Sequence, residues 1–149
     1  MNLSFSVVPK FIIGAVILGV GFKAMPQDNR IIIHVIDGRN GKPVQNEHIL
    51  IFQGASAQDI RELKNHLDLQ TDANGIALLP PEAMQQIQVS VDWHKVCQPS
   101  SSNSIFSLEE IKRSGVATPN SCGSNAQKPA PNHFYVFVRP LSFWEKMRL

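Results

Sequence analysis

The sequence predicts an all-β fold, an antiparallel β-sandwich with one or two short helical insertions and an N-terminal signal or anchor segment. Three observations support this prediction. Runs rich in Val and Ile recur along residues 31–91 and again at residues 133–139. Clusters of Gly, Asn, Asp and Pro, which favour turns, separate those runs. The first 24 residues contain an uncharged apolar segment unlike anything that follows.

A single domain, which we place at residues 30–149, accounts for the chain after its first segment. A chain of 149 residues can bury a modest core. All twelve acidic residues follow Met25, whereas Lys10 and Lys23 precede it, so the chain after Met25 carries 12 Lys and Arg against 12 Asp and Glu. Binding to a phosphate backbone needs a surplus of cations. The neutral domain therefore argues against nucleic acid as a partner.

Residues 1–24 are typical of a signal peptide or of an N-terminal membrane anchor. Residues 11–22 are apolar and uncharged, and Lys10 precedes them. This run is shorter than the ~20 residues of a membrane-spanning helix, which favours a secretory signal. Cleavage after Gly21 or Ala24 would release the domain, whereas an uncleaved segment would hold it at the membrane. Both alternatives predict export to the periplasm or to the outside of the cell.

Cys97 and Cys122 are the two cysteines of the chain. In an oxidising compartment two cysteines most simply form one disulfide, whereas a cytosolic chain would keep two buried thiols. A catalytic cysteine is the least favoured alternative, because neither residue belongs to a nucleophile motif with a partner histidine. We therefore expect a Cys97–Cys122 disulfide.

Two β-hairpins are predicted in the first half of the chain. Ile31–Asp37 forms a strand that turns and returns along residues 45–52, and the second turn, at residues 71–75, leads into Ile76–Leu79. Gly supplies a left-handed conformation in such turns, Pro fixes φ, and Asp bonds to nearby backbone. On these grounds we assign five structural turn residues: Asp37, Gly41, Pro43, Asp72 and Gly75.

Between the hairpins and after them, weaker patterns predict further elements. Ser56 and Asp59 indicate a helix start, after which Ile60, Leu63 and Leu67 recur at helical spacing. Residues 86–92 alternate between polar and apolar side chains, as in a half-buried strand that continues to Trp93 and His94.

The last third of the chain combines two capping patterns with a loop and a strand. Ser107 and Glu110 form an S-x-x-E capping box for a helix that Gly115 ends. Residues 118–131 are rich in Pro, Asn, Ser and Gly and should form a loop, and residues 133–139 form the last strand. Ser142 and Glu145 form a second capping box for a terminal helical tail.

No residues of the chain make a convincing catalytic, cofactor or metal site. His34, His48, His94 and His133 lie on or beside predicted strands, and one register of the first hairpin places His34 opposite His48. Zinc needs three or four converging ligands, and no close-spaced ligand pair occurs. Asp72, Asn74 and Gly75 resemble the start of a calcium loop but lack its later ligands, so turn formation accounts for them. Glu109 and Glu110 lie at a predicted helix start, where carboxylates interact favourably with the helix dipole. Asp92 together with Glu109 and Glu110 is a conceivable set of acid and base carboxylates, but the capping role accounts for the two glutamates.

The tail offers a candidate partner surface formed by Phe143, Trp144 and Met147. These apolar side chains alternate with charged ones, so the tail could dock a partner or a membrane surface. The alternative, which we favour, is that Phe143 and Trp144 cover the end of the sandwich.

Two motifs resemble those of the carboxypeptidase regulatory-like domains, small prealbumin-like (transthyretin-like) sandwiches of exported bacterial proteins. They are residues 35–38 with the Gly41-Lys42-Pro43-Val44 turn, and the Thr71-Asp72-Ala73-Asn74-Gly75 turn. The resemblance covers residues 31–91 and implies a prealbumin-like or Ig-like sandwich, without an activity. Transthyretin-like hydrolases of purine breakdown end in Tyr-Arg-Gly-Ser, whereas this chain ends in Glu145-Lys146-Met147-Arg148-Leu149. Their chemistry is therefore not transferred.

We expect an exported, non-enzymatic module without a cofactor that binds a protein or glycan of the cell envelope. The alternative is a structural accessory subunit that touches the membrane only through an uncleaved N-terminal segment. A small hydrolase using His94 or His133 is the third hypothesis.

Overall fold

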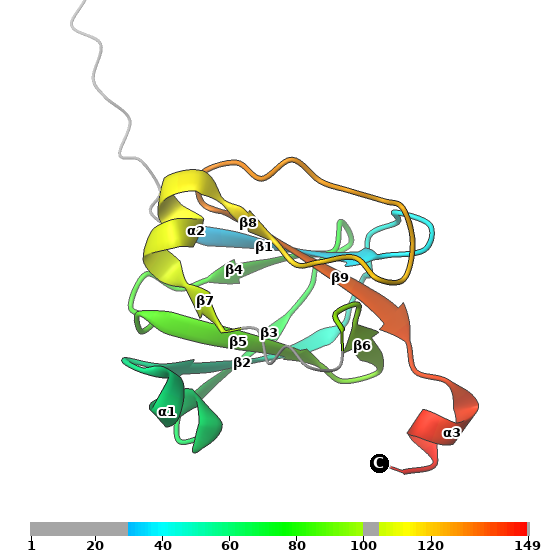
Figure 1. The fold of residues 1–149 in the computed structure, drawn as a ribbon, viewed down its shortest axis with the longest axis horizontal. Helices are drawn as coiled ribbons and strands as arrows, with labels where there is room; N and C mark the ends of the chain where they lie inside the picture. The colour runs from blue at the N-terminus through cyan, green and yellow to red at the C-terminus, as the bar shows by residue number, and fades with distance from the viewer. Residues whose placement is uncertain (1–29, 100–104, 149) are drawn as a thin grey trace, which may run out of the picture.

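Two β-sheets pack face to face in the computed structural model, which describes residues 30–99 and 105–148 (Figure 1). The expected signal or anchor segment, residues 1–24, lies outside the described residues. Among the described residues no helix is both long enough and apolar enough to cross a bilayer. The coarse prediction of an all-β, two-sheet fold with short helices is confirmed.

The order of strands in the first sheet is β4-β1-β9-β6, and β8 also pairs with β9. These strands are β1 (Ile31–Asp37), β4 (Ile76–Leu79), β6 (His94–Val96), β8 (Val116–Ala117) and β9 (His133–Pro140). The order in the second sheet is β3-β2-β5-β7. Its strands are β2 (His48–Gly54), β3 (His66–Gln70), β5 (Gln86–Val91) and β7 (Phe106–Ser107). The described helices are α1 (Ala57–Arg61), α2 (Leu108–Ser114) and α3 (Phe143–Lys146).

Strand alternation builds the core between the sheets. The buried side chains of β1 that face the second sheet are those of Ile31, Ile33 and Val35. On β9 the corresponding buried side chains are those of Phe134, Val136 and Val138. Because successive side chains of a strand point to opposite faces, the intervening residues form an outer face on each sheet. The predicted alternation of β5 is confirmed, since its three apolar side chains all enter the core: Ile87, Val89 and Val91.

The first sheet is not wholly antiparallel. β1 and β9 are neighbours and run parallel, with Ile33 opposite Phe134 and Val35 opposite Val136. β8 is also parallel to β9. The first and last long strands of the domain therefore lie side by side at the centre of one sheet.

Both predicted hairpins are wrong. β1 pairs with β4 and β9, whereas β2 pairs with β3 and β5, so residues 38–47 carry the chain from one sheet to the other. The turn at residues 71–75 does the same between β3 and β4. Gly, Asp and Pro set the local backbone angles of a turn, but they do not determine which strands pair. An inter-sheet arch and a hairpin therefore carry the same local signals.

The two arches pack against each other. Val44 N donates to Val35 O (2.9 Å), and Val35 N donates to Gly75 O (2.8 Å). The Thr71 hydroxyl donates to Val44 O (2.9 Å) and accepts from Glu47 N (2.8 Å). Thr71 is buried, so these bonds satisfy polar groups that would otherwise destabilise the fold.

The assigned turn residues occupy the expected local roles within these arches. Gly41 has φ of +73° and Gly75 has φ of +71°, the left-handed region that favours Gly. Asp72 Oδ1 accepts from Asn74 N (2.8 Å) and Ile76 N (2.9 Å), and Asp37 Oδ1 accepts from Arg39 N (2.8 Å). Pro43 lies against Gly75: a Cβ built on Gly75 would stand 2.8 Å from Pro43 Cβ.

The helices follow the capping patterns in part. α1 has the reciprocal Ser56–Asp59 capping box and buries Ile60. It ends early, however: Leu63 is 56% exposed, and Leu67 belongs to β3 instead of the helix. Residues 66–70 pair with β2 instead of extending the helix. A helix this short gains little stability from propensity, so strand pairing is favoured over the short apolar repeat.

The helix α2 was predicted at the right place but with the wrong cap. It ends at Gly115 (φ +73°) as expected, yet the Ser107 side chain makes no capping bond. Ser107 instead belongs to β7, paired with Gln86, and Leu108 N donates to Gln85 O (2.9 Å). A neighbouring strand thus supplies the acceptor that a capping side chain would provide.

The strand after Val91 also departs from expectation. The chain turns at Asp92 and Trp93, and His94 then begins β6 in the other sheet, opposite Pro140. His94 therefore does not stand at the end of the same strand as residues 86–92. The predicted last strand is confirmed as β9, and residues 118–131 have no regular structure, as expected.

Candidate functional site

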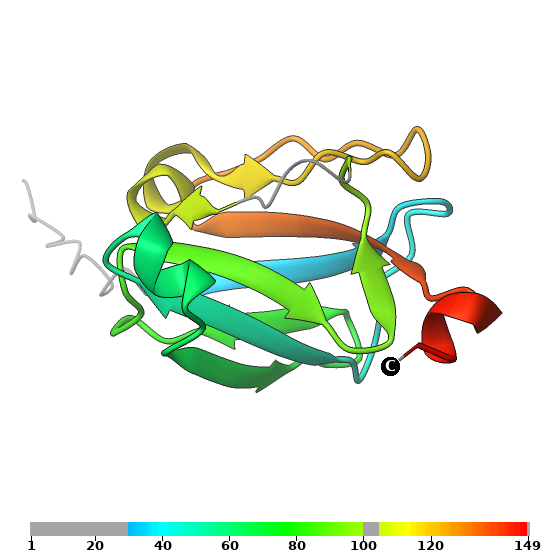
Figure 2. The same ribbon diagram turned by 60° about the horizontal axis from the view of Figure 1, so that its bottom comes forward.

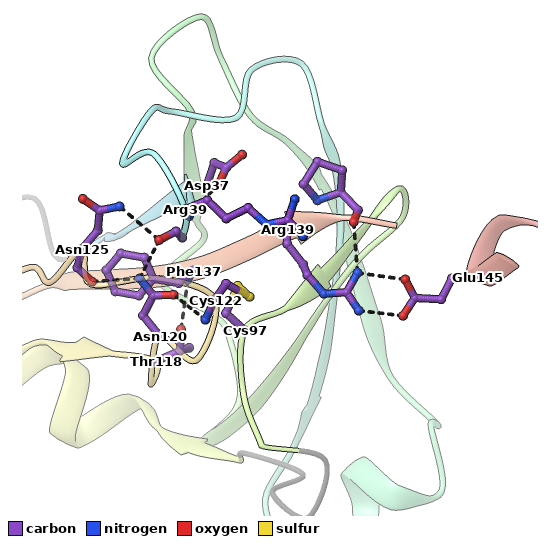
Figure 3. The surroundings of a disulfide bond; sticks show 12 residues. Asp37, Arg39, Cys97, Thr118, Asn120, Cys122, Asn125, Phe137, Arg139 and Glu145 are labelled. Carbon is purple, nitrogen blue, oxygen red and sulfur yellow. Dashed lines mark hydrogen bonds and ion pairs between the residues drawn. A yellow bond between two sulfur atoms is a disulfide. The ribbon is translucent and has the colours of Figure 1, made fainter. Parts of the chain in front are cut away.

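A disulfide joins Cys97 to Cys122, as predicted, with the two Cα atoms 5.4 Å apart (Figure 3). Cys97 directly follows β6 and is 1% exposed, and Cys122 lies in the loop of residues 118–131. The bond belongs to a second, small apolar cluster on the outer face of the first sheet, which includes Ile36 and Phe137. The loop therefore covers part of that face.

Two asparagines fasten the same loop to the first arch. The carbonyl oxygen of Gly38 accepts from Asn120 Nδ2 (2.8 Å) and from Asn125 Nδ2 (3.0 Å), as Figure 3 shows. Thr118 Oγ1 accepts from Phe137 N (3.0 Å) at the other end of the loop. Side-chain amides take the place of strand pairing here, so the loop is ordered without regular structure. This region is structural support.

The histidines do not gather at one place. His34 Nε2 lies 2.8 Å from His133 Nδ1 on the outer face of the first sheet, and the Tyr135 ring stacks on His34 with centroids 4.5 Å apart. Burial lowers the pKa of His34, and neighbouring His133 lowers it further, while Asp72 opposes the shift. The expected register of His34 opposite His48 is wrong, because their strands lie in different sheets.

His48 is on the outer face of the second sheet, between two carboxylates. Its Nδ1 lies 3.0 Å from Asp92 Oδ2, and its Nε2 lies 3.4 Å from Asp68 Oδ1. His66 extends the row at 3.8 Å from Asp68. All four side chains are well exposed. Asp92 therefore has a partner on the surface, His48.

His94 has a buried partner that the sequence did not indicate. Glu47, 8% exposed, accepts from Trp93 N through Oε1 (3.0 Å), and the same oxygen lies 3.2 Å from His94 Nδ1. The second contact is close enough for an ion pair but poorly aligned for a hydrogen bond, and Nδ1 has no other partner among the described residues. Glu47 thereby ties the turn between β5 and β6 to the arches. It follows a turn and precedes a strand, where a carboxylate is usually solvated, so no local signal marks it.

The remaining acidic candidates fall into separate places. Backbone N–H groups of Ile76 and Asn74 lower the pKa of Asp72, whose carboxylate is thus occupied by its own turn. Glu109 and Glu110 are exposed in the first turn of α2. Within residues 30–99 and 105–148, no group of three or more His, Cys, Asp or Glu side chains could hold a metal ion.

Open cavities among the described residues border the second sheet. One of about 490 Å³ lies between α2 and the start of β5, where Gln86 Oε1 is buried without a hydrogen-bond partner among the described residues. The other, about 360 Å³, lies beside β6 and is lined in part by Asp92, His94 and Leu141. Each could hold water or a small polar group.

The C-terminal end of the sandwich carries large exposed apolar side chains, which we call the aromatic end: Trp93 (59% exposed), Phe143 (67%), Trp144 (73%) and Met147 (69%). The favoured prediction, that Phe143 and Trp144 cover the sandwich, is therefore wrong. In Figures 1 and 2, α3 stands away from the two sheets beyond the end of β9. Trp93 lies beside the segment that joins β9 to α3, because its carbonyl oxygen accepts a hydrogen bond from Leu141 N (3.1 Å).

Polar contacts hold α3 in place. Glu145 receives two hydrogen bonds from Arg139, at 2.8 and 2.7 Å (Figure 3), and lies 3.8 Å from Lys95 Nζ. The predicted capping box is present between Ser142 and Glu145. Arg139, followed by the Ser142 backbone and hydroxyl, holds the pKa of the Glu145 carboxyl well below its usual range.

Comparison with known proteins gives no relative. No protein-family model, no curated protein and no solved structure matches the chain. The function must therefore be argued from the molecule alone.

Proposed function

We propose that the chain is an exported, non-enzymatic β-sandwich module of the cell envelope that acts as a binding or accessory domain. The observation that carries the proposal is the disulfide between Cys97 and Cys122, which ties a long loop to the sheet. Disulfides persist in oxidising compartments and are rare in the cytosol. An envelope protein or glycan is the partner that this proposal implies.

The finer fold assignment is part of the same proposal. We assign the domain to the prealbumin-like sandwiches of the carboxypeptidase regulatory-like kind. In support, the two motifs that carry the resemblance lie against each other, through Val44, Thr71 and Gly75. These contacts explain the motif residues as structural, so the motifs imply no reaction.

The compartment can be tested by counting thiols. Protein recovered from the periplasm or medium is denatured without reductant and treated with a thiol-alkylating reagent. The proposal expects no alkylated cysteine before reduction and two afterwards. Absence of the protein from the periplasm and medium would contradict export. Two free thiols in the exported protein would contradict the disulfide, on which the argument for export rests.

A membrane-anchored accessory subunit is the second candidate, favoured by the apolar residues 11–22. Mass spectrometry of the N-terminus of exported protein separates the two candidates. A mature start near Phe22 or Met25 supports the released module, whereas an intact Met1 supports the anchored subunit.

The non-enzymatic part of the proposal rests on the structural pairings of the histidines. The double variant His94→Gln/His133→Gln should fold and should lose no measurable hydrolytic activity. Stoichiometric zinc in the purified protein that disappears in the double variant would instead make a metal site the leading interpretation.

A further inference from the structure

We propose that the aromatic end, displayed by α3, docks the domain on the surface of an anionic lipid bilayer. This goes beyond the proposed function, which concerns the compartment and the scaffold and assigns membrane contact only to the N-terminal segment.

The orientation of α3 is the first argument. Helices at the surface of a soluble domain usually turn their apolar side chains inward. In α3 the polar side is inward, since Glu145 bonds to Arg139, and Phe143, Trp144 and Met147 point to solvent. Isolated helices of four residues are unstable in water, so the capping box and the Arg139 pair are needed to hold this arrangement. The fold thus fixes three large apolar side chains in an exposed position.

The charges around these side chains are the second argument. Lys146 and Arg148 flank Met147 in the chain, and Lys95 and Arg139 lie against Glu145, the one acidic residue within residues 139–148. Beside Trp93, Asp92 is paired with His48 and Glu47 is buried, so cations predominate among the exposed charges of this end. An apolar centre with a cationic rim complements a bilayer that carries anionic headgroups. Trp is the residue that most favours the interface between headgroups and acyl chains, and both tryptophans of the chain lie here.

The ring geometry argues against a glycan as the occupant. Sugar rings stack on flat, accessible aromatic faces, whereas Phe143 and Trp144 meet edge to face, at 76° with centroids 5.5 Å apart. The carboxylate of α3, Glu145, is occupied by Arg139 and by the Ser142 backbone N–H, so it is not free to accept from sugar hydroxyls. The projecting, convex shape in Figure 2 suits insertion into a soft surface.

Tryptophan fluorescence tests the proposal directly. The variant Trp93→Phe leaves Trp144 as the sole tryptophan of the full-length chain. Mixed with phosphatidylglycerol–phosphatidylcholine vesicles, it should show a blue-shifted emission that brominated acyl chains quench, and the effect should be weaker with phosphatidylcholine alone. Because the readout is local to α3, attachment through residues 11–22 alone would leave Trp144 unshifted and unquenched. That outcome would overturn the proposal, as would emission that shifts only with an added protein or glycan.

Variants sharpen the test. The next variants keep Trp93. The double variant Phe143→Ser/Met147→Ser should reduce the vesicle-dependent quenching of tryptophan emission about tenfold at equal lipid concentration, because it removes two apolar side chains from the interface. Leu63→Ser/Met84→Ser, which removes two exposed apolar side chains (56% and 40%) outside the aromatic end, is the control and should bind as wild type does. Lys146→Glu/Arg148→Glu should abolish the preference for anionic lipid. Equal quenching in all variants would contradict the proposal, and the thiol count would remain a separate test of export.

Discussion

At the scale of single residues, Gly75 shows how one position serves two turns. Its left-handed φ is required by its own turn, and its missing Cβ makes room for the other arch. A Cβ there would stand 2.9 Å from Val35 O and 3.0 Å from Val44 N, both backbone atoms that cannot easily move. A Cβ on Gly41, at nearly the same φ, would meet only the Asn125 side chain, at 3.1 Å or more.

Substitutions at Gly41 and Gly75 allow the cost of backbone strain to be separated from the cost of steric crowding. Gly41→Ala should lower the free energy of unfolding by about 1–2 kcal/mol, chiefly through backbone strain, because the Asn125 side chain can shift slightly to admit the Cβ. Gly75→Ala should cost about 1–3 kcal/mol more because of overpacking, and Gly75→Val should cost at least as much as Gly75→Ala. Urea unfolding measures each difference. Equal losses in the two alanine variants would show that the arches do not crowd Gly75, and an unchanged melting temperature would refute the turn.

His34 predicts a pH dependence of stability. Its pKa in the folded protein lies below the ordinary value of 6.5, first through burial and then through His133. Below pH 6.5 the unfolded chain therefore binds a proton that the folded chain does not, so stability falls as the pH drops from 6.5 through the folded pKa. His34→Gln, which keeps a hydrogen-bonding side chain, should reduce this loss between about pH 7.5 and pH 5.5. Identical losses in variant and wild type would exclude His34 as the source.

Residues with a local signature could be predicted from the sequence, and those without one could not. Asp72 acts within its own turn, and so does the left-handed φ of Gly75, so the neighbouring residues reveal both. The close approach of the other arch to Gly75 has no such local signature. Glu47 is buried only because Trp93 and His94, far away in the chain, come to meet it. Its role depends on tertiary structure alone.

At the scale of elements, a capping pattern predicts the cap correctly where the capping residue takes no part in strand pairing. Ser56 and Ser142 make their predicted bonds, whereas Ser107 does not, because strand pairing with Gln86 occupies its place. A capping pattern thus predicts a helix start better than it predicts the cap itself. The short strands β6, β7 and β8 contain too few residues to show an alternation of polar and apolar side chains, so the sequence does not predict them.

The attachment of α3 gives a prediction at this scale. Glu145→Gln removes the ion pair with Arg139 and weakens the capping box, so amide hydrogen exchange at residues 143–147 should accelerate while the melting temperature stays close to that of wild type. Glu109→Gln, an exposed first-turn carboxylate of α2, is the matched control and should leave α3 unchanged. Unaltered exchange in Glu145→Gln would mean that other contacts hold the helix.

The same attachment should resist acid. The pKa of Glu145 is lowered in the folded protein, so its contribution is present above the ordinary value of 4.5 and is lost only as the pH falls through the lower folded value. After correction for intrinsic exchange rates, protection of α3 should therefore be the same at about pH 7 and about pH 4.

At the scale of the whole molecule, sequence reasoning found the class of fold but not its topology. Apolar runs and turn residues predict strands, yet whether adjacent strands pair or change sheets depends on the packing of the complete sandwich. The parallel neighbours β1 and β9 illustrate this, since about a hundred residues separate the paired positions, such as Ile32 and His133. The aromatic end, too, was visible as a pattern, but its exposure required the position of α3.

The disulfide is the feature through which one bond should influence the whole molecule. Cys97 and Cys122 are separated by 25 positions, and closing a loop of this size reduces the entropy of the unfolded chain, which stabilises the fold by about 3–4 kcal/mol in the loop-closure account. The loop includes α2, whose seven residues are too few for an independently stable helix. Cys97→Ser/Cys122→Ser should therefore lower the free energy of unfolding by about that amount, a large share of the stability of a small domain.

The control must separate the bond from the contacts beside it. Asn120→Ala removes the amide that donates to Gly38 O and accepts from Cys122 N but leaves the disulfide intact. Gly38 O keeps its bond from Asn125, so the cost should be about 1–3 kcal/mol, chiefly through the donor of Cys122 that loses its partner. Under reducing conditions the wild type should fall to the stability of the double-serine variant, while that variant should not change. If reduction leaves the wild type unaffected, the second apolar cluster around Ile36 and Phe137 holds the loop by packing alone, and the bond is only an addition to it.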